Sequence, residues 1–188
     1  MYKVILASGS PRRRELMTGL GIAYEVRTLP DVDETYPASL QGADIPLYIA
    51  KEKADAYIPQ MQPDELIITA DTIVWMDGKV LGKPHDREDA LRMLRALSGR
   101  THEVFTGVCI TTAQQQRTFS VRTEVRFSTL SEEEMTYYVN HYHPMDKAGA
   151  YGVQEWIGYI GVEYISGSYY NIMGLPVQRL YQELKTIL

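Results

Sequence analysis

Short apolar runs alternate with amphipathic stretches along this chain of 188 residues, an alternation typical of a mixed α/β protein. Residues 3–7 and 66–70 are apolar runs, and each predicts a buried strand. Residues 86–97 are amphipathic and predict a helix. A further helix is expected over 45–57, with Asp44 as its cap.

Directly after the first strand, the residue types predict the start of a helix. Ser10 can cap this helix and Pro11 suits its first position, because proline needs no backbone hydrogen bond there. Leu16 and Leu20 lie four residues apart and therefore share one face. The first predicted strand and helix are thus joined by only a few residues, Ser8-Gly9-Ser10.

Turn residues separate the remaining predicted strands. Residues 73–76 and 79–81 flank Asp77-Gly78, a strong signal for a two-residue hairpin. Residues 104–112 and 117–130 predict two antiparallel strands, and in the second of them apolar and polar positions alternate, so that one face should meet water.

Two more helices are expected towards the C-terminus. Ser131 and Glu134 have the spacing of a capping box, which opens a helix. The last helix should begin at Pro176 and turn three side chains inward: Leu180, Tyr181 and Leu184. Together these elements predict a mixed α/β fold in a single domain, residues 1–188.

Composition and charge restrict the function classes. Hydrophobic residues make up 45% and charged residues 23% of the chain, which is ordinary for a globular protein. The net charge of −5 argues against binding of nucleic acid or of a membrane surface through bulk electrostatics. The single cysteine, Cys109, lies in an apolar run and is interpreted as a buried structural thiol. With no signal peptide or apolar span, the chain is expected to be cytoplasmic.

The segment Ser8-Gly9-Ser10-Pro11-Arg12-Arg13-Arg14 carries the clearest chemical signal. Three arginines in the first turn of a helix are unfavourable alone, because the helix N-terminus already carries partial positive charge. A bound phosphate would remove the conflict, since backbone N–H groups, hydroxyls and guanidinium groups all suit it. The alternative is a solvated basic patch, and in either case at least one arginine should face solvent.

Carboxylates supply the opposite charge. Asp71 follows the apolar run 66–70, so it is expected to emerge at the end of a buried strand, where open α/β sheets bind ligands. The acidic segment 31–34 could join it around Mg²⁺ or Mn²⁺, because such ions are commonly held by one or two carboxylates and the phosphates of the substrate. The alternative for Asp71 is a turn former or a helix cap, and the alternative for residues 31–34 is an exposed acidic loop.

Other polar residues are weaker candidates. Three lysines could add positive charge to a phosphate site, although a solvated surface lysine is the favoured interpretation of each: Lys53 on the second predicted helix, Lys83 in Gly82-Lys83-Pro84, and Lys147. The sequence His141-Tyr142-His143 resembles a metal-binding pair only superficially and is interpreted as a polar loop.

Six segments, in order along the chain, resemble the Maf family of nucleoside triphosphate pyrophosphatases. The matching segments, which extend from residue 6 to residue 176, are Leu6 to Arg13, Ala70 to Val74, Gly82 to Pro84, Ser98 to His102, Asp146 to Gln154, and Gly167 to Pro176. The resemblance implies the Maf/Ham1 inosine-triphosphatase-like fold, an elongated mixed sheet flanked by helices with a cleft between two lobes. It also implies hydrolysis of a nucleoside triphosphate to the monophosphate and pyrophosphate with a divalent cation.

The same resemblance assigns roles to individual residues. Asp71 matches the family's proton acceptor, and with Glu34 it would hold the metal. Three residues match positions linked to substrate choice: Arg12, Thr72 and Gln154. Four others match the phosphate-binding residues: Ser8, Arg13, Lys53 and Lys83.

The segment ending in Gln154 is similar to the branch of the family that acts on dTTP and UTP. A glutamine amide could pair with the carbonyl and the N3–H of such a base. This activity implies cleansing of nucleotide pools and a link to cell-division arrest. The resemblance further implies a homodimer, which the apolar run 104–112 would support. The alternatives are the branch that acts on 7-methyl-GTP, a non-catalytic nucleotide sensor that regulates cell division, and a sugar-phosphate phosphatase.

Overall fold

Seven strands form one mixed sheet in the computed structural model, which describes residues 2–30 and 32–188. Along the sheet the strand order is β2-β1-β3-β5-β6-β7, and β4 pairs with β3. The long strands β3 (Glu65–Met76), β5 (Thr101–Thr111) and β6 (Gln116–Phe127) contribute to both of the compact units into which the chain divides. The predicted mixed α/β class is confirmed, whereas the cleft between two lobes stays a prediction.

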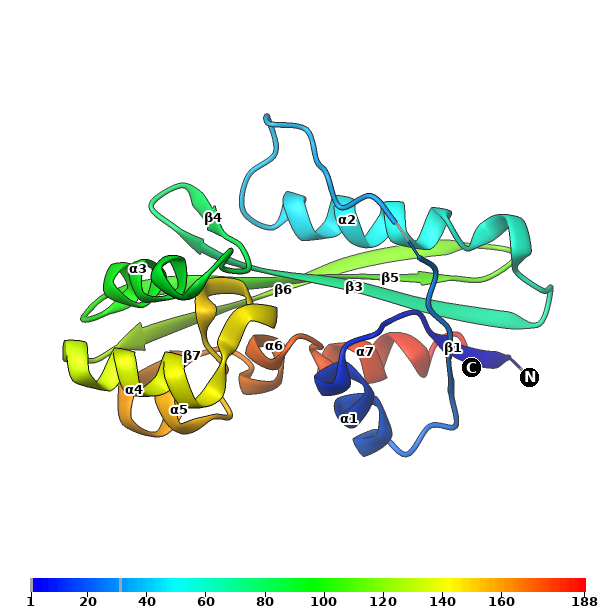
Figure 1. Cartoon of the computed structure of the whole chain (residues 1–188). Coiled ribbons are helices and arrows are strands. Elements are labelled where there is room, and N and C mark those ends of the chain that lie inside the picture. The colour runs from blue at the N-terminus through cyan, green and yellow to red at the C-terminus, as the bar shows by residue number, and fades with distance from the viewer. Residues whose placement is uncertain (1, 31) are drawn as a thin grey trace. The chain divides into compact units, whose positions relative to one another are not determined.

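Unit 1 consists of Met1–Thr72, Thr106–Val121 and Gly174–Leu188. Its remaining elements are β1 (Lys3–Leu6), α1 (Pro11–Gly19), β2 (Glu25–Val26), α2 (Asp44–Asp55), the 3-10 turn η1 (Ile58–Gln60) and α7 (Val177–Leu184). Strand β1 runs parallel to both β2 and β3, with Ile5 opposite Ile67 in the fully buried centre. Figure 1 shows α2 on one face of this part of the sheet and α1 and α7 on the other.

Unit 2 consists of Ile73–Phe105 and Arg122–Met173. Its own elements are β4 (Lys79–Leu81), α3 (Arg87–Leu97), α4 (Glu132–Tyr142), the 3-10 turns η2 (Pro144–Asp146) and η3 (Ala148–Ala150), α5 (Trp156–Gly161), β7 (Val162–Ser166) and α6 (Tyr169–Met173). Strand β7 pairs antiparallel with β6. The sequence patterns did not predict β2, α5, β7 or α6, which are all short.

Most of the caps and turns predicted from short sequence patterns are present in the structure. Helix α1 begins at Pro11 with Ser10 as its cap, and the Ser131–Glu134 capping box opens α4. Asp77 and Gly78 both adopt positive φ and join β3 to β4 in the predicted hairpin. Such signals act over a few residues, so a sequence can specify them without tertiary contacts.

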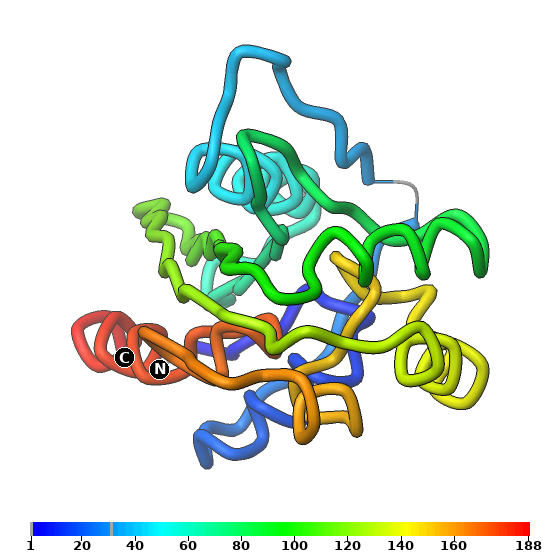
Figure 2. Tube along the Cα trace, turned by 90° about the vertical axis from the view of Figure 1, so that its left-hand side faces the viewer, coloured from blue at the N-terminus to red at the C-terminus, as the bar shows by residue number. Residues whose placement is uncertain are grey.

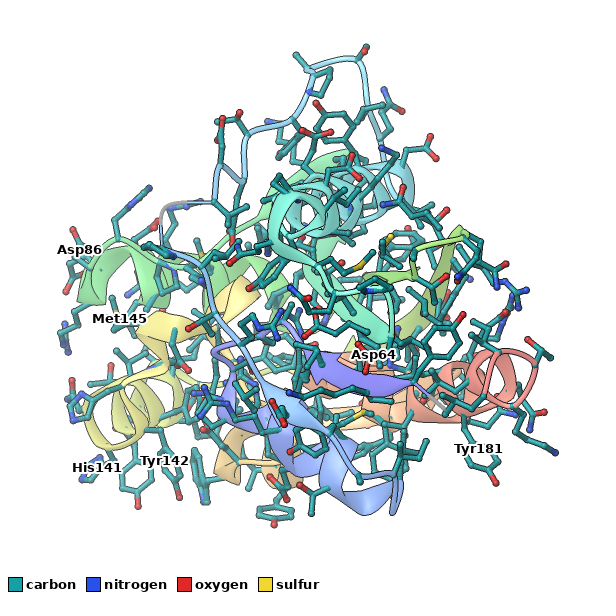
Figure 3. The ribbon with its side chains drawn as sticks, turned by 90° about the vertical axis from the view of Figure 1, so that its right-hand side faces the viewer. Asp64, Asp86, His141, Tyr142, Met145 and Tyr181 are labelled. Atoms are coloured by element: carbon teal, nitrogen blue, oxygen red, sulfur yellow. The ribbon has the colours of Figure 1, made fainter. Side chains whose placement is uncertain are left out.

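Three expectations about α2, α7 and β3 were wrong. Asp44 is the first residue of α2 rather than its cap, which is Ala43. Tyr181 does not face inward, because only Leu180 and Leu184 on α7 are buried, and Figure 3 shows Tyr181 on the outer side of that helix. Strand β3 does not end before Asp71 but continues to Met76, since a polar residue can lie within a strand when it finds a partner.

The tube in Figure 2 follows the same arrangement in unit 1, with α2 separated from α1 and α7 by the strands. Cys109 on β5 is fully buried, as predicted, and burial raises the pKa of its thiol. Across the described ranges, 2–30 and 32–188, none of the helices is long and apolar enough to cross a membrane.

The core of unit 2 contains a buried histidine. The imidazole of His102 meets the rings of Phe127 and Tyr151 edge-on, and its Nε2 shares a hydrogen bond of 2.7 Å with the Tyr151 hydroxyl. Among the described residues nothing hydrogen-bonds to its Nδ1. Burial away from water lowers the pKa of His102 from 6.5 to about 4.

This histidine predicts a loss of stability in mild acid. Between pH 6.5 and pH 4 the unfolded chain binds a proton at His102 that the folded protein does not, so the free energy of unfolding falls as the pH falls. By pH 5 the loss at this site is about 2 kcal/mol. Urea unfolding should therefore show that the free energy of unfolding decreases more between pH 7 and pH 5 for the wild type than for His102→Gln. Equal losses would contradict the prediction.

Candidate active site

Two serine hydroxyls hold the turn at the start of α1. Ser8 is buried, and its hydroxyl accepts a hydrogen bond of 3.2 Å from the backbone N–H of Ser10. The Ser10 hydroxyl in turn accepts from the N–H of Arg13. Because the first turn of this helix contains no acidic residue, nothing within it balances the partial positive charge of the helix end.

The three arginines at this turn have different surroundings. Arg14 is exposed, as helical geometry predicted for at least one of them, whereas Arg12 and Arg13 are partly buried. The Arg14 side chain reaches only back to the Ser8 carbonyl, at 3.5 Å. The turn therefore directs Arg12 and Arg13, and not Arg14, away from bulk solvent.

Arg13 connects segments that are far apart in the sequence. Its Nε donates to the Gly174 carbonyl at 2.7 Å, its Nη1 to the Ala70 carbonyl at 2.8 Å, and its Nη2 to the Thr72 hydroxyl at 3.1 Å. The Thr72 hydroxyl also lies 2.8 Å from that of Thr106. The Arg13 guanidinium therefore joins two of the three segments of unit 1 directly, and Thr72 adds the third through Thr106.

The electrostatics of Arg13 follow from this position. Burial lowers the pKa of its guanidinium, and the nearby Asp71 carboxylate opposes that change. Gly174 has a φ of 112°, a conformation that favours glycine, and it presents its carbonyl to Arg13 from that geometry.

Asp71 and Glu34 converge on one lysine. The Lys53 ammonium on α2 lies 3.0 Å from Asp71 Oδ1 and 2.9 Å from Glu34 Oε1. The side chains of Lys53 and Asp71 are only 15% and 12% exposed, so their ion pair is largely shielded from water, while the Glu34 side chain is 54% exposed. Asp31, the first residue of the acidic segment, lies outside the described residues.

This cluster fits a divalent cation with oxygen ligands. The two carboxylates already share one positive charge, the Lys53 ammonium, and a pair of carboxylates is what Mg²⁺ usually takes from a protein when phosphates complete its coordination. In the described part of the chain there is no group of three or more His, Cys, Asp or Glu side chains that could bind a metal alone. A cation at this place would therefore depend on ligands from the substrate.

The other predicted site residues belong to unit 2. Lys83 is exposed in the loop after β4, and Gln154 is half-buried in the segment before α5. The two segments are joined, because the Gly149 N–H donates to the Gly82 carbonyl at 3.0 Å. The structure thus brings Ser8, Arg12, Arg13, Glu34, Lys53, Asp71 and Thr72 into unit 1, and Lys83 and Gln154 into unit 2.

Two weaker candidates are also placed by the structure. His141 and Tyr142 are the last two residues of α4, so the interpretation of this segment as a polar loop was wrong. His141 Nδ1 lies 2.7 Å from the Tyr137 carbonyl one helical turn earlier, and Figure 3 shows its side chain at the outer surface of α4. Lys147 is buried and paired with Asp146 and Glu155, so it is not a solvated surface lysine. The sequence patterns gave no role to Glu155 or to its partner Tyr138, since their contact joins residues 17 positions apart.

Comparison with known proteins places the chain in a family. A family model described as Maf-like protein matches residues 3–187. A dTTP/UTP pyrophosphatase from Bacteroides thetaiotaomicron is 69% identical over 99% of this chain and 96% of its own length. One from Flavobacterium johnsoniae is 45% identical over 99% and 95%. A solved HAM1 protein from Coxiella burnetii shares the fold, with a TM-score of 0.54 at 14% identity over 99% of this chain and 100% of that one. The protein belongs to the Maf family.

Proposed function

We propose that this protein hydrolyses dTTP and UTP to the corresponding monophosphate and pyrophosphate. The observation that carries the proposal is the pairing, within unit 1, of a shielded carboxylate with a cationic turn: Asp71 lies between Ala70 and Thr72, the two β3 residues that Arg13 contacts. The choice of substrate is supported by the relatives described above, which are named dTTP/UTP pyrophosphatases.

Binding of the triphosphate needs positive charge and N–H donors. The first turn of α1, with the Ser8 hydroxyl and Arg12, would bind phosphate oxygens, and Lys53 and Lys83 would add positive charge. Arg13 is assigned to the same site, but three of its N–H groups donate to protein acceptors, so its main contribution would be to fix the position of β3 against α1.

The reaction breaks the bond between the α-phosphorus and the oxygen that bridges to the β-phosphorus. Asp71 would accept a proton from a water molecule while the oxygen of that water bonds to the α-phosphorus. The electron pair of the broken bond would leave on pyrophosphate. Lys53 would hold the Asp71 carboxylate in position, through the hydrogen bond of 3.0 Å between them, until substrate enters.

Asp71 and Glu34 would hold a divalent cation, Mg²⁺ or Mn²⁺, together with the substrate phosphates. Such an ion neutralises phosphate charge and polarises the phosphorus–oxygen bonds. Thr72 and Arg12 would contribute to substrate choice, and Gln154 would pair with the carbonyl and N3–H of a uracil or thymine ring. Removal of non-standard pyrimidine nucleotides from the cellular pool, and a link to cell-division arrest, are the biological roles that this activity supports.

A product analysis tests the proposal. Purified protein is incubated with dTTP, UTP, CTP, GTP or 7-methyl-GTP, each with Mg²⁺, with Mn²⁺ or with EDTA. Pyrophosphate with dTMP or UMP is expected in the presence of metal and should disappear in EDTA.

The other outcomes separate the alternatives. Turnover of 7-methyl-GTP would support the proposed reaction and contradict the proposed substrates. Orthophosphate in place of pyrophosphate as the product would indicate a phosphatase. Binding of dTTP with no turnover of any nucleotide would favour a nucleotide sensor. The homodimer remains a separate prediction, to be checked by the molar mass in solution.

A further inference from the structure

Gln154 lies in an irregular segment that is nevertheless buried. Most of residues 147–153 are buried, although regular structure there is limited to a short 3-10 turn in which Gly149 and Ala150 have positive φ. Buried backbone outside helices and strands must find other hydrogen-bond partners. The contacts that hold this segment therefore fix where Gln154 lies within unit 2.

Gln154 occupies the centre of a tight turn. The N–H of Glu155 donates to the Gly152 carbonyl at 3.0 Å and closes a turn with Val153 and Gln154 at its two central positions. Close packing leaves no room beside Gly152, where an added Cβ would lie 3.0 Å from Glu155 Cδ and 3.0 Å from Lys147 Cε. The turn is thus packed directly against the side chains of Glu155 and Lys147.

One hydroxyl group, that of Tyr138 on α4, ties both ends of this turn. It accepts a hydrogen bond of 2.9 Å from the Gly152 N–H and donates a short hydrogen bond to Glu155 Oε2. Tyr138 is fully buried, and burial together with the Glu155 carboxylate raises the pKa of its hydroxyl, which therefore keeps its proton and remains a donor.

The second carboxylate oxygen of Glu155 has a cationic partner. Lys147 Nζ lies 3.2 Å from Glu155 Oε1 and 2.8 Å from Asp146 Oδ1, and its side chain is only 10% exposed. The Glu155 side chain, at 21% exposure, is therefore held at both oxygens. Because Lys147 has a second carboxylate, neutralising Glu155 would not leave the buried ammonium without a counter-charge.

We propose that Glu155 is a positioning residue for base recognition: held by Tyr138 and Lys147, it fixes the turn from which Gln154 presents its amide to the pyrimidine. Uracil and thymine present a carbonyl and an N3–H where cytosine presents an amino group and an unprotonated N3. An amide held in the orientation that suits uracil strengthens the binding of that base alone, whereas an amide on a loose turn loses that preference. The inference rests on the proposed function.

Two variants test it from opposite sides of the contact. Glu155→Gln keeps the shape of the side chain but removes its charge, and Tyr138→Phe removes the hydroxyl that joins both ends of the turn. Tyr142→Phe is the matched control, because Tyr142 stacks on Tyr138 from the same helix while its side chain is partly exposed at the surface (Figure 3).

Binding is measured with α,β-imido UTP and α,β-imido CTP, in which the bond to be hydrolysed is blocked, and kcat is measured with UTP. In Glu155→Gln and Tyr138→Phe the dissociation constant of the UTP analogue should rise about tenfold, while that of the CTP analogue and kcat should change by less than about twofold. Tyr142→Phe should match the wild type in all three.

The outcomes separate this inference from the proposed function. Equal weakening of both analogues, or no change in either, would overturn the positioning role, since a purely structural role affects both bases alike. Absence of UMP and pyrophosphate from wild-type protein would instead overturn the proposed function. The double variant should weaken binding no more than either single change, because residues that act as one unit are not additive.

Discussion

Replacing Asp71 by asparagine is expected to lower kcat for dTTP and UTP by about 100-fold or more, the usual contribution of a positioned general base. Nucleotide binding measured in EDTA, where the cation that Asp71 would hold is absent, should remain or become tighter, because the change removes a negative charge close to the triphosphate. The fold should tolerate it, since the asparagine carbonyl can still accept the hydrogen bond from Lys53 and Glu34 still neutralises that ammonium. The measurements are kcat and the dissociation constant of α,β-imido UTP.

Asp64→Asn is the matched control for that variant. Asp64 lies directly before β3, at the opposite end of the strand segment that leads to Asp71, and its side chain is exposed (Figure 3). Removing the charge of Asp64 should leave both kcat and nucleotide binding unchanged. A kcat for Asp71→Asn within about threefold of the wild type would show that another group accepts the proton.

Replacing Arg13 by alanine is expected to have the largest effect on stability. It leaves the carbonyls of Ala70 and Gly174 without their guanidinium partner, and a buried polar group that loses its partner costs about 1–3 kcal/mol. A decrease of about 3–5 kcal/mol in the free energy of unfolding follows. Activity should fall as well, because the contact with Thr72 that holds β3 against α1 is lost. Urea unfolding and turnover of UTP check the two parts.

Arg14→Ala tests the same helical turn without those contacts, because Arg14 is exposed and reaches only the Ser8 carbonyl. Its stability should change by less than about 0.5 kcal/mol. If Arg13→Ala fails to fold, Arg13→Lys provides the measurement. The donors of an ammonium group lie on a single nitrogen, so they cannot reach the three acceptors that the three guanidinium nitrogens contact. An unfolding free energy for Arg13→Lys equal to that of the wild type would contradict the connecting role.

The elements that could be predicted from the sequence are those with strong local signals. Ser10 and Pro11 specify the start of α1, and the Ser131–Glu134 box specifies that of α4, because capping involves residues within one turn. The Asp77-Gly78 hairpin has the same origin, in two residues that accept positive φ. Short elements such as α6 and β7 were missed, because they have too few residues to show a period.

The candidate site was predicted in part. The residue types in the Ser8 to Arg14 segment were sufficient to indicate an anion site, since arginines at a helix N-terminus conflict with the helix dipole. A strand that continues through Asp71 was not predicted, because a carboxylate is unfavourable in a buried strand until its partner is known. That partner, Lys53, is 18 residues away on α2.

The sequence by itself determined the α/β class, the starts of α1 and α4, the main hairpin and the types of residue available for phosphate chemistry. Only the tertiary structure decided which arginine connects the segments of unit 1, which lysine pairs with Asp71 and Glu34, and which side chains hold the turn that carries Gln154. The physical reason is the separation of the partners along the sequence. Caps and turns find their hydrogen-bond partners among neighbours in the chain. Arg13, in contrast, contacts Gly174, 161 residues away, and Tyr138 contacts Glu155 only after the chain has folded.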